Sequence, residues 1–409
     1  MKYILLIGDG MGDVPVPALN NQTPLEAAVT PAMDRLARAS EMLLVRTVPE
    51  GYPPGSDVAN LSLMGYEPER YYTGRAPLEA ASLGVELAPE DIAFRCNLVH
   101  VEQPGDGRLI MVDYSSGHIT TEESRQLIAA LQAECGNDLL ALHPGVSYRH
   151  LLVYRGVVPA GFATVPPHDH SDQDVAGYYQ AYRQVEAFGP LLARAREILA
   201  DHPVNRERAR QGKRTANCIW LWGEGKRPAM ETLEQRFGIR GGLISAVDLL
   251  KGIGVLGGLE VVDVPGATGY LDTNYEGKAQ AALKVLEKDD FVLVHVEAPD
   301  ETGHQGLARE KVQAVADFDS RIVAPIVEEM ERRGEPFRLV VTMDHYTPIH
   351  RRTHEDWPVP MFLYDSRGVA APSGRTYTEA NVLAAVQENG LELPSGAAFF
   401  RRFVEREQA

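Results

Sequence analysis

Three short apolar segments, each followed closely by acidic or histidine residues, constrain the fold of this chain more than any other feature. The segments are residues 3–7, 290–296 and 337–342, and each consists mainly of apolar residues. Strands of a parallel sheet whose two faces are both covered have this continuous pattern. Between the last two segments, residues 311–332 repeat their apolar positions with helical period. The order strand, helix, strand therefore predicts an α/β fold.

The polar residues beyond these segments predict a single site. Asp9 follows the first segment, Asp300 and His304 follow the second, and Asp344 and His345 follow the third. In open α/β sheets, ligands bind beyond the carboxyl ends of the strands. We therefore expect these three loops to converge.

The same residues are typical of a metal site. Asp300 and His304 are four positions apart, so one helical turn can direct both at one ion, and His354 follows nine residues after His345. Carboxylate oxygens mixed with imidazole nitrogens suit Zn, Mn or Fe. Taken singly, such an Asp can be a helix cap and such a His a structural residue. Together they favour a metal site.

Ser56 is the candidate nucleophile. It follows a turn made by Pro53, Pro54 and Gly55, and the apolar residues after it indicate a helix. A serine at a helix N-terminus lies where backbone N–H groups and the helix dipole favour a phosphate. A bound metal would activate its hydroxyl without a neighbouring base. The alternative is that Ser56 is only the N-cap of that helix.

Three basic residues are candidates for holding an anionic substrate. Arg75 follows a glycine, Arg95 precedes Cys96-Asn97, and Lys251 precedes a glycine. A neighbouring glycine lets the backbone approach a ligand closely. Arg206 and Arg208 are interpreted as solvated helix charges.

Length and charge limit the remaining possibilities. A chain of 409 residues exceeds what one hydrophobic core usually organises, so we expect two domains. We expect a core of residues 1–78 and 216–409, interrupted by an inserted domain of residues 79–215 that is richer in polar segments. The formal net charge of −17 argues against nucleic acid and anionic membranes as partners. Bound cations would offset part of it.

The remaining composition is that of an intracellular chain. Three cysteines without metal-type spacing predict reduced thiols in a cytoplasmic protein. The apolar run at the N-terminus is too short for a signal sequence, and no stretch reaches the roughly 20 apolar residues of a membrane span.

Several short motifs together resemble one family. They are Gly8-Asp9-Gly10, Gly55-Ser56-Asp57, Tyr72-Thr73-Gly74-Arg75, Phe94-Arg95-Cys96-Asn97, Gly266-Ala267-Thr268-Gly269, residues 298–304 and Asp344-His345. With these motifs the chain resembles, over nearly its whole length, the archaeal-type 2,3-bisphosphoglycerate-independent phosphoglycerate mutases of the alkaline phosphatase superfamily. The fold implied is a doubly wound, mostly parallel sheet core like that of alkaline phosphatase, with an inserted smaller α/β domain.

The resemblance also implies a site with two divalent ions, Mn or Zn, and no 2,3-bisphosphoglycerate cofactor. One ion would be bound by Asp9, Ser56, Asp344 and His345, and the other by Asp300, His304 and His354. Ser56 would be the nucleophile that is phosphorylated while 3-phosphoglycerate and 2-phosphoglycerate interconvert. Arg75, Arg95, His168, Asp169 and Lys251 would bind this small phosphorylated substrate. The inserted domain would hold the carboxylate part of the substrate, and the resemblance implies no oligomeric state.

Other motifs resemble a bacterial branch of the family that has been proposed to act as homoserine kinases in threonine synthesis. Asp113-Tyr114-Ser115-Ser116-Gly117-His118 and Trp220-Leu221-Trp222-Gly223 are two of them. Transfer to homoserine, or to water as in a phosphatase, is therefore the alternative to the mutase reaction. The chain departs from the family pattern at Tyr346 and Trp357, which affects the surroundings of the metal ligands.

Overall fold

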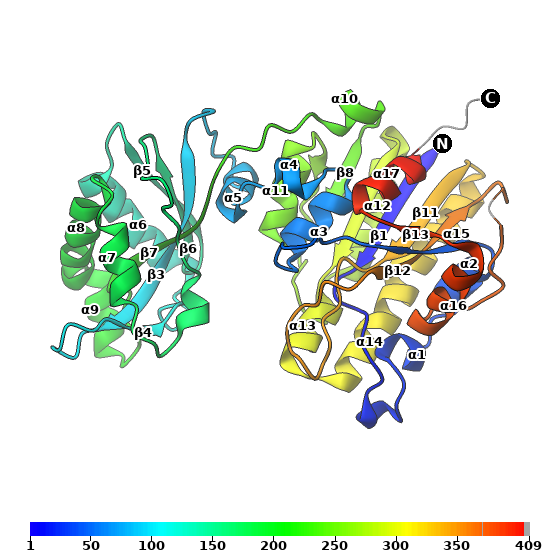
Figure 1. Ribbon diagram of the computed structural model, residues 1–409, viewed down its shortest axis with the longest axis horizontal. Coiled ribbons are helices and arrows are strands. Elements are labelled where there is room, and N and C mark those ends of the chain that lie inside the picture. Colours follow the sequence, from blue (N-terminus) through cyan, green and yellow to red (C-terminus); the bar gives the residue numbers. More distant parts are fainter. Residues whose placement is uncertain (370, 405–409) are drawn as a thin grey trace. The chain divides into compact units, whose positions relative to one another are not determined.

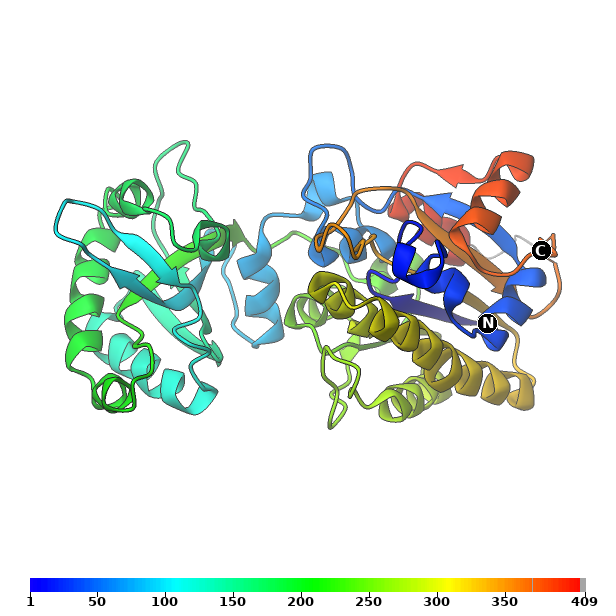
Figure 2. The ribbon, with the colours of Figure 1, turned by 90° about the horizontal axis from the view of Figure 1, so that it is seen from below.

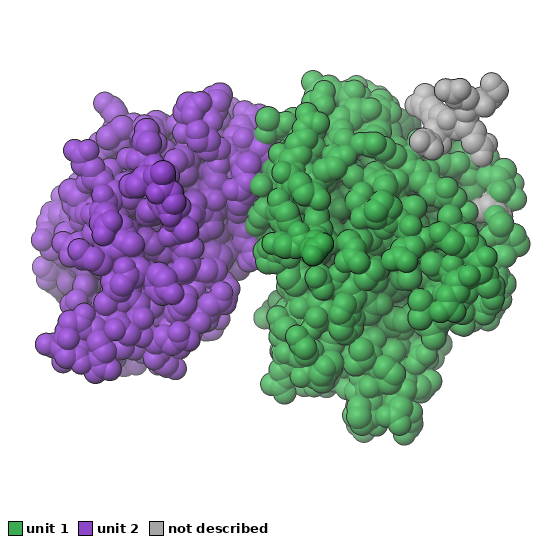
Figure 3. All heavy atoms as spheres, viewed as in Figure 1, with its two compact units in different colours: residues 1–72, 229–409 green, residues 73–228 purple. Residues whose placement is uncertain are grey.

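The chain folds into two units, one of which is inserted into the other (Figure 3). The computed structural model describes residues 1–369 and 371–404. Unit 1 comprises Met1–Tyr72 and Ala229–Ala409, and unit 2 comprises Thr73–Pro228. Within the described part of the chain, no helix combines the length and the apolar character needed to cross a membrane.

Unit 1 is built on an eight-stranded sheet. In spatial order the strands are β13 (Glu392–Leu393), β2 (Glu41–Val45), β12 (Val359–Asp365), β11 (Phe337–Thr342), β1 (Lys2–Gly8), β10 (Phe291–Val296), β8 (Gly241–Ile244) and β9 (Glu260–Val261). The sheet is parallel except at β12, which runs antiparallel to both of its neighbours. The expected mostly parallel α/β core is confirmed.

The three apolar segments form the centre of this sheet. Strands β10, β1 and β11 are adjacent and buried at nearly every position. Ile7 near the end of β1 pairs with His295 of β10 on one side and with Thr342 of β11 on the other. Because the register is shared, the three strands end at the same edge of the sheet.

Helices cover both faces of the sheet (Figures 1 and 2). The expected helical stretch at 311–332 is α14 (Ala308–Phe318) and α15 (Ala324–Arg333), joined by a π-helical turn at Asp319–Val323. The other helices of unit 1 are α1 (Pro24–Ala27), α2 (Pro31–Arg38), α3 (Ser56–Leu63), α4 (Pro68–Tyr71), α10 (Leu233–Phe237), α11 (Asp248–Leu256), α12 (Tyr275–Lys288), α13 (Ala298–Gln305), α16 (Glu379–Asn389) and α17 (Gly396–Val404).

Unit 2 has its own sheet and core. Strand β3 (Ile92–Glu102) lies between β6 (Arg149–Tyr154) and β7 (Cys218–Lys226) and also pairs with β4 (Ile110–Asp113), while β5 (Leu140–Val146) pairs with β6. All of these pairs are antiparallel. The helices are α5 (Arg75–Ser82), α6 (Thr121–Cys135), α7 (Ala176–Tyr182), α8 (Phe188–Asp201) and α9 (Pro203–Arg210).

The unit boundaries differ from the expected 78/79 and 215/216. Helix α5 contacts β7 and β3, and β7 pairs with β3 along most of its length, so both elements belong to unit 2. The chain enters and leaves unit 2 at one place, where the Thr73 hydroxyl donates to the Lys226 carbonyl at 2.6 Å. Gly225 is required there, because a Cβ atom would lie 2.3 Å from the Thr73 carbonyl oxygen.

A buried lysine joins the loops that follow β1 and β11. The Lys311 side chain of α14 is fully buried, and Nζ donates to the Gly12 carbonyl (3.0 Å), Asp13 Oδ2 (3.0 Å) and the Thr347 carbonyl (2.8 Å). Asp13 Oδ2 also accepts from the Ile349 N–H at 3.0 Å. One cation therefore fixes both loops to α14.

The change Lys311→Met is expected to lower the free energy of unfolding by about 3–5 kcal/mol, because it leaves the Asp13 carboxylate buried without its partner. The double change Lys311→Met/Asp13→Leu should recover a large part of this loss, because no buried charge is left. Urea denaturation measures both values. A single variant within about 1 kcal/mol of the wild type would contradict this role for Lys311.

Candidate metal centre and nucleophile

The ends of β1, β10 and β11 bring the predicted carboxylates and histidines together. Asp9 follows β1 directly, Asp300 and His304 lie on α13 just after β10, and Asp344 and His345 lie just after β11. Asp9, Asp344 and His345 are at most 2% exposed. The side chains at the three strand ends therefore converge, as the sequence pattern predicts.

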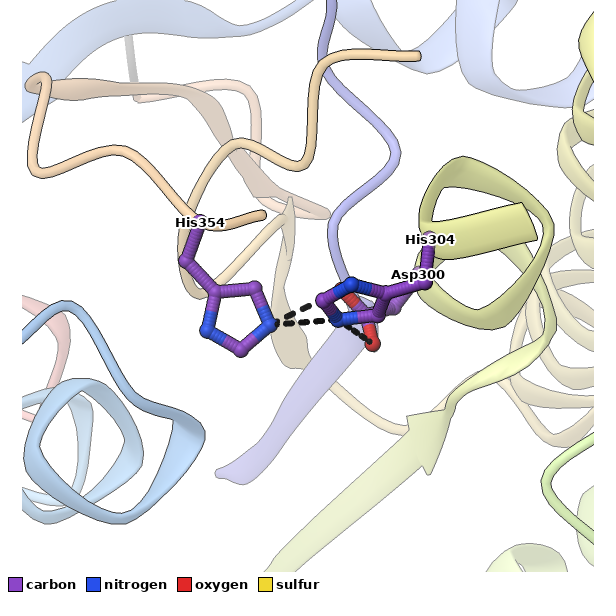
Figure 4. A group of neighbouring side chains, drawn as sticks. All are labelled: Asp300, His304 and His354. Atoms are coloured by element: carbon purple, nitrogen blue, oxygen red, sulfur yellow. Dashed lines mark hydrogen bonds and ion pairs between the residues drawn. The ribbon is translucent and has the colours of Figure 1, made fainter. Parts of the chain in front are cut away.

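Asp300, His304 and His354 form the first group (Figure 4). His304 Nε2 is 3.2 Å from Asp300 Oδ2, His354 Nε2 is 3.3 Å from Asp300 Oδ1, and the two Nε2 atoms are 2.8 Å apart. Ligands at 2.0–2.2 Å from one tetrahedral ion are about 3.4 Å apart. Two imidazole nitrogens and a carboxylate, all directed inward, therefore fit a transition-metal ion.

Asp9, Asp344 and His345 form the second group, with Ser56 beside it. His345 Nε2 is 3.5 Å from Asp9 Oδ1, 3.6 Å from Asp344 Oδ2 and 3.0 Å from Ser56 Oγ. Asp9 Oδ1 is buried and has no hydrogen-bond partner among the described residues. A buried carboxylate oxygen without a partner is costly, and a cation between these side chains would compensate it.

The electrostatics of the second group also favour a cation. Burial raises the pKa of Asp9 well above its usual range, and the neighbouring Asp344 and Asp300 raise it further. Burial lowers the pKa of His345 to about 4, so its imidazole is neutral at pH 7 and keeps a lone pair for a ligand. The carboxylates of Asp9, Asp300 and Asp344 lie close together and need positive charge, which the described side chains supply only in part.

Ser56 is the first residue of α3 and not its cap. Gly55, with extended backbone angles of φ −112° and ψ 153°, is the N-cap, and the cap makes no side-chain hydrogen bond. The Ser56 hydroxyl is directed instead at His345. Asn60, one turn further along α3, donates to the Ser56 carbonyl (2.8 Å) and to Asp344 Oδ2 (2.8 Å), which ties the helix start to the carboxylate group.

The sequence pattern does not identify several of the side chains at this site. Asn60 and Thr347 contact the predicted residues directly, since Thr347 Oγ1 donates to Asp300 Oδ1 at 2.5 Å and lies 3.3 Å from His345 Nδ1. His295 is hidden in the apolar run of β10. Its only sequence signal is a titratable residue on an otherwise apolar strand that leads directly into the Asp300 motif.

The two departures from the family pattern contact each other. Tyr346 and Trp357 pack edge to face with ring centroids 5.3 Å apart, and the Tyr346 carbonyl accepts from the Glu355 N–H at 3.0 Å. The pair therefore closes the loop that carries His354.

The predicted substrate residues separate into two places. Arg75, Arg95, His168 and Asp169 belong to unit 2, whereas Lys251 lies on α11 of unit 1 and pairs with Asp263 at 2.8 Å. Asp263, its ion-pair partner, belongs to neither group of the metal centre.

In unit 2, Arg95 is the centre of a cationic group. Its guanidinium is buried, pairs with Glu79 at 3.0 Å and lies 4.0 Å from the Trp222 ring centroid. Burial lowers the pKa of Arg95, and although Glu79 raises it, the positive charges of Arg75 and Arg149 lower it further. Arg95 Nε is buried and has no hydrogen-bond partner among the described residues.

His168 and Asp169 lie at the edge of this group. The His168 ring packs against Trp222 with centroids 5.3 Å apart, and its Nε2 is 3.6 Å from Asp169 Oδ1. Burial lowers the pKa of His168, Asp169 raises it, and the nearby Arg75 and Arg95 lower it. A concentration of positive charge against aromatic rings is suited to an anion.

Comparisons with known proteins agree with this arrangement. Residues 37–205 match the family model described as 2,3-bisphosphoglycerate-independent phosphoglycerate mutase. A Geobacter sulfurreducens protein named a probable enzyme of this kind is 49% identical over 99% of this chain and 100% of its own length. The Methanosarcina barkeri protein of that name is 50% identical over 93% of this chain and 94% of its own.

Two solved structures cover the chain almost completely. A Pyrococcus horikoshii protein superposes with a TM-score of 0.81 at 27% identity, covering 100% of this chain and 99% of its own. A cofactor-independent phosphoglycerate mutase from Thermoplasma acidophilum superposes with a TM-score of 0.66 at 27% identity, covering 99% of each chain.

Proposed function

The chain belongs to the 2,3-bisphosphoglycerate-independent phosphoglycerate mutases, and from this premise we propose that it interconverts 3-phosphoglycerate and 2-phosphoglycerate through a phosphorylated Ser56. The observation that carries the proposal is the position of Ser56 Oγ. It lies at the N-terminus of α3, 3.0 Å from His345 Nε2, and no cap role uses it.

The two groups of side chains fit two divalent ions, and we propose Mn or Zn. Asp300, His304 and His354 would hold one ion, and Asp9, Ser56, Asp344 and His345 the other. Bound ions would lower the pKa of the Ser56 hydroxyl and offset the negative charge that builds up on the phosphoryl oxygens. No 2,3-bisphosphoglycerate is needed in this scheme, because Ser56 itself stores the phosphoryl group.

Ser56 performs both half-reactions. After its hydroxyl has lost a proton, Oγ attacks the phosphorus of 3-phosphoglycerate, the bond from phosphorus to the C3 oxygen breaks, and that oxygen takes up a proton. The C2 hydroxyl of the retained glycerate then loses a proton and its oxygen attacks the same phosphorus, the bond from phosphorus to Ser56 Oγ breaks, and Oγ takes up a proton. A phosphoryl group on Ser56 would lie at the N-terminus of α3, where backbone N–H groups and the helix dipole favour an anion.

Glycerate must stay bound between the two half-reactions. The cationic group of unit 2 is our candidate for its carboxylate, with Arg75, Arg95, His168 and Asp169 as the binding residues, and Lys251 as a candidate for the phosphate. We also propose a cytoplasmic location, which suits a small phosphorylated metabolite as substrate. The excess of guanidinium charge around Arg95 supports the proposal that unit 2 binds the carboxylate.

The change Arg95→Lys is expected to raise KM for 3-phosphoglycerate about 10–100-fold with a smaller effect on kcat. Lysine keeps the charge but loses the planar fork and the stacking on Trp222. Initial rates over a range of substrate concentrations measure the two constants separately. An unchanged KM would remove Arg95 from the substrate site.

A direct assay tests the function. Metal-loaded protein without 2,3-bisphosphoglycerate should convert 3-phosphoglycerate into 2-phosphoglycerate, which phosphorus NMR resolves. The same samples with added homoserine test the alternative acceptor, and release of inorganic phosphate tests water. If Ser56 is phosphorylated but no 2-phosphoglycerate forms, the mutase assignment is wrong. Phosphohomoserine would then identify the kinase branch.

A further inference from the structure

A buried arginine of unit 2 holds a loop of unusual backbone conformation. Arg208 of α9 is 3% exposed, so its interpretation as a solvated helix charge is wrong, whereas the side chain of Arg206 is 59% exposed and fits that interpretation. The Arg208 guanidinium donates to the Ser116 carbonyl (2.6 Å), the Arg214 carbonyl (2.9 Å) and Glu123 Oε2 (2.7 Å). Each of its three nitrogens therefore has a partner, and hydrogen bonds from a charged donor are strong.

The loop that Arg208 holds is residues 113–118, and it contains three consecutive residues in the left-handed backbone region. Their φ angles are +52° at Ser116, +66° at Gly117 and +49° at His118. Residues other than glycine rarely adopt this conformation, which persists only where surrounding contacts compensate its cost. The hydrogen bond from Arg208 to the Ser116 carbonyl is one of these contacts.

Asp113 supplies further contacts. Its Oδ2 accepts from the Gly117 N–H (2.8 Å) and the Arg214 side chain (2.9 Å), and its Oδ1 accepts from the N–H (2.7 Å) and the hydroxyl (2.6 Å) of Ser115. Burial raises the pKa of Asp113, but these hydrogen bonds outweigh it and lower the pKa to about 2, so the carboxylate is charged at pH 7. Because the Arg214 carbonyl also accepts from Arg208, the two arginines and the carboxylate form one network around the loop.

Tyr114 of this loop belongs to a continuous row of rings. It packs edge to face against Tyr148 and His168, with centroids 5.7 and 6.0 Å apart, and His168 packs against Trp222 at 5.3 Å. The Arg95 guanidinium lies over the Trp222 ring at 4.0 Å, and its buried Nε has no hydrogen-bond partner among the described residues. The row therefore connects the loop with the cationic group, and the His168 ring is held by two aromatic contacts.

We propose that Arg208 is a positioning residue for the anion site around Arg95. It fixes residues 113–118, and Tyr114 of that loop fixes the ring of His168. The proposal rests on the function proposed above, because it concerns the site for the glycerate carboxylate. Arg208 itself does not touch the substrate in this scheme, since all three of its nitrogens are engaged. A site that is ordered before its ligand arrives binds it more tightly, because no ordering cost remains.

The test measures binding without turnover. Full-length protein with isotope-labelled histidines is loaded with Zn²⁺ and titrated with D-glycerate, which carries no phosphoryl group, and NMR follows the ring signals of His168. The change Arg208→Met should shift these signals in the free protein and raise the dissociation constant about 5–100-fold, because Tyr114 and His168 must then be ordered on binding. Arg208→Lys keeps the charge and a donor for the Ser116 carbonyl, so its dissociation constant should lie between those of Arg208→Met and the wild type.

Kinetics give a second readout that a purely structural role would not produce. With 3-phosphoglycerate as substrate, Arg208→Met should raise KM by a factor similar to its loss of glycerate affinity and leave kcat within about threefold of the wild type. The reason is that Ser56 and the side chains around it belong to unit 1, which this change does not touch.

Arg206→Met is the matched control, because it removes the same charge from the same helix. Arg206 pairs with Asp201 at 3.2 Å and makes no printed contact with residues 113–118. Its glycerate affinity and its His168 signals should equal those of the wild type. This comparison separates the contacts of Arg208 from the general attraction of an anion to positive charge.

Three results overturn the proposal: wild-type affinity in Arg208→Met, an equal loss in Arg206→Met, or no binding of glycerate by the wild type. The proposed function is decided separately by the formation of 2-phosphoglycerate, so the two failures are distinguishable. If Arg208→Met does not fold, Gly117→Ala decides. Gly117 is exposed and a Cβ atom there meets Arg208 Nη2 at 3.5 Å, so alanine fits in space but disfavours the φ of +66°. It should weaken glycerate binding about 3–10-fold, and unchanged affinity would show that the loop conformation does not order the site.

Discussion

The change Ser56→Ala is expected to reduce the interconversion of 3- and 2-phosphoglycerate at least about 10⁴-fold. Only the hydroxyl is removed, so the reaction loses its covalent intermediate while the carboxylate and imidazole ligands stay in place. Alanine is also compatible with the first turn of α3, where Gly55 is the cap. Coupled rate measurements give the loss of activity, and intact-protein mass shows whether a phosphoryl group is still taken up.

Ser62→Ala on the same helix is the control. Ser62 is fully buried, and its Oγ accepts the Gly396 N–H at 3.1 Å, away from the carboxylates. Its loss should cost about 1 kcal/mol of stability and leave turnover near the wild-type value. Turnover by Ser56→Ala within about tenfold of the wild type would show that another group carries the phosphoryl.

The second large effect is expected at Asp300. It belongs to the group with His304 and His354, and its carboxylate also lies close to Asp9 and His345, so its charge acts on both proposed ions. The change Asp300→Asn keeps the volume and removes the charge. It should lower kcat/KM at least about 10³-fold and weaken the binding of both ions, because one loses a negative ligand and the other loses a neighbouring negative charge.

Glu301→Gln is the matched change one residue along α13. Burial raises the pKa of Glu301, but the carboxylate belongs to no metal-binding group among the described residues. We expect its metal affinity and turnover to stay close to those of the wild type. Calorimetric titration with Mn²⁺ compares the variants, and an Asp300→Asn protein that still binds both ions tightly would argue against the shared role.

The central sheet could be predicted because each of its main strands is recognisable as a run of apolar residues. A strand buried on both faces is apolar at most positions, and adjacent parallel strands end at one edge, so Asp9, Asp300 and Asp344 are expected to meet. The same uniformity concealed His295. One polar residue in an apolar run reveals neither its partners nor the face of the sheet that it occupies.

The role of Ser56 could not be decided from the sequence, because Gly55 and Ser56 are both acceptable N-caps. The turn at Pro53 and Pro54 places Gly55 in the cap conformation, and the choice depends on that geometry. The exact boundaries of the units could not be predicted for another reason. Strand β7 pairs with β3, which lies more than a hundred residues earlier in the chain. Composition does not predict a pairing between segments so far apart.

The adjacent entry and exit of unit 2 have a consequence for the order of folding. Unit 1 is assembled from two chain segments, and with unit 2 unfolded these are joined by a loop of residues 73–228. Once unit 2 has folded, the contact between Thr73 and Lys226 shortens this connection to a few residues. The loop entropy saved is roughly 3 kcal/mol. Unit 2 therefore favours the meeting of β1 with β10 and β11, and so the formation of the metal centre itself.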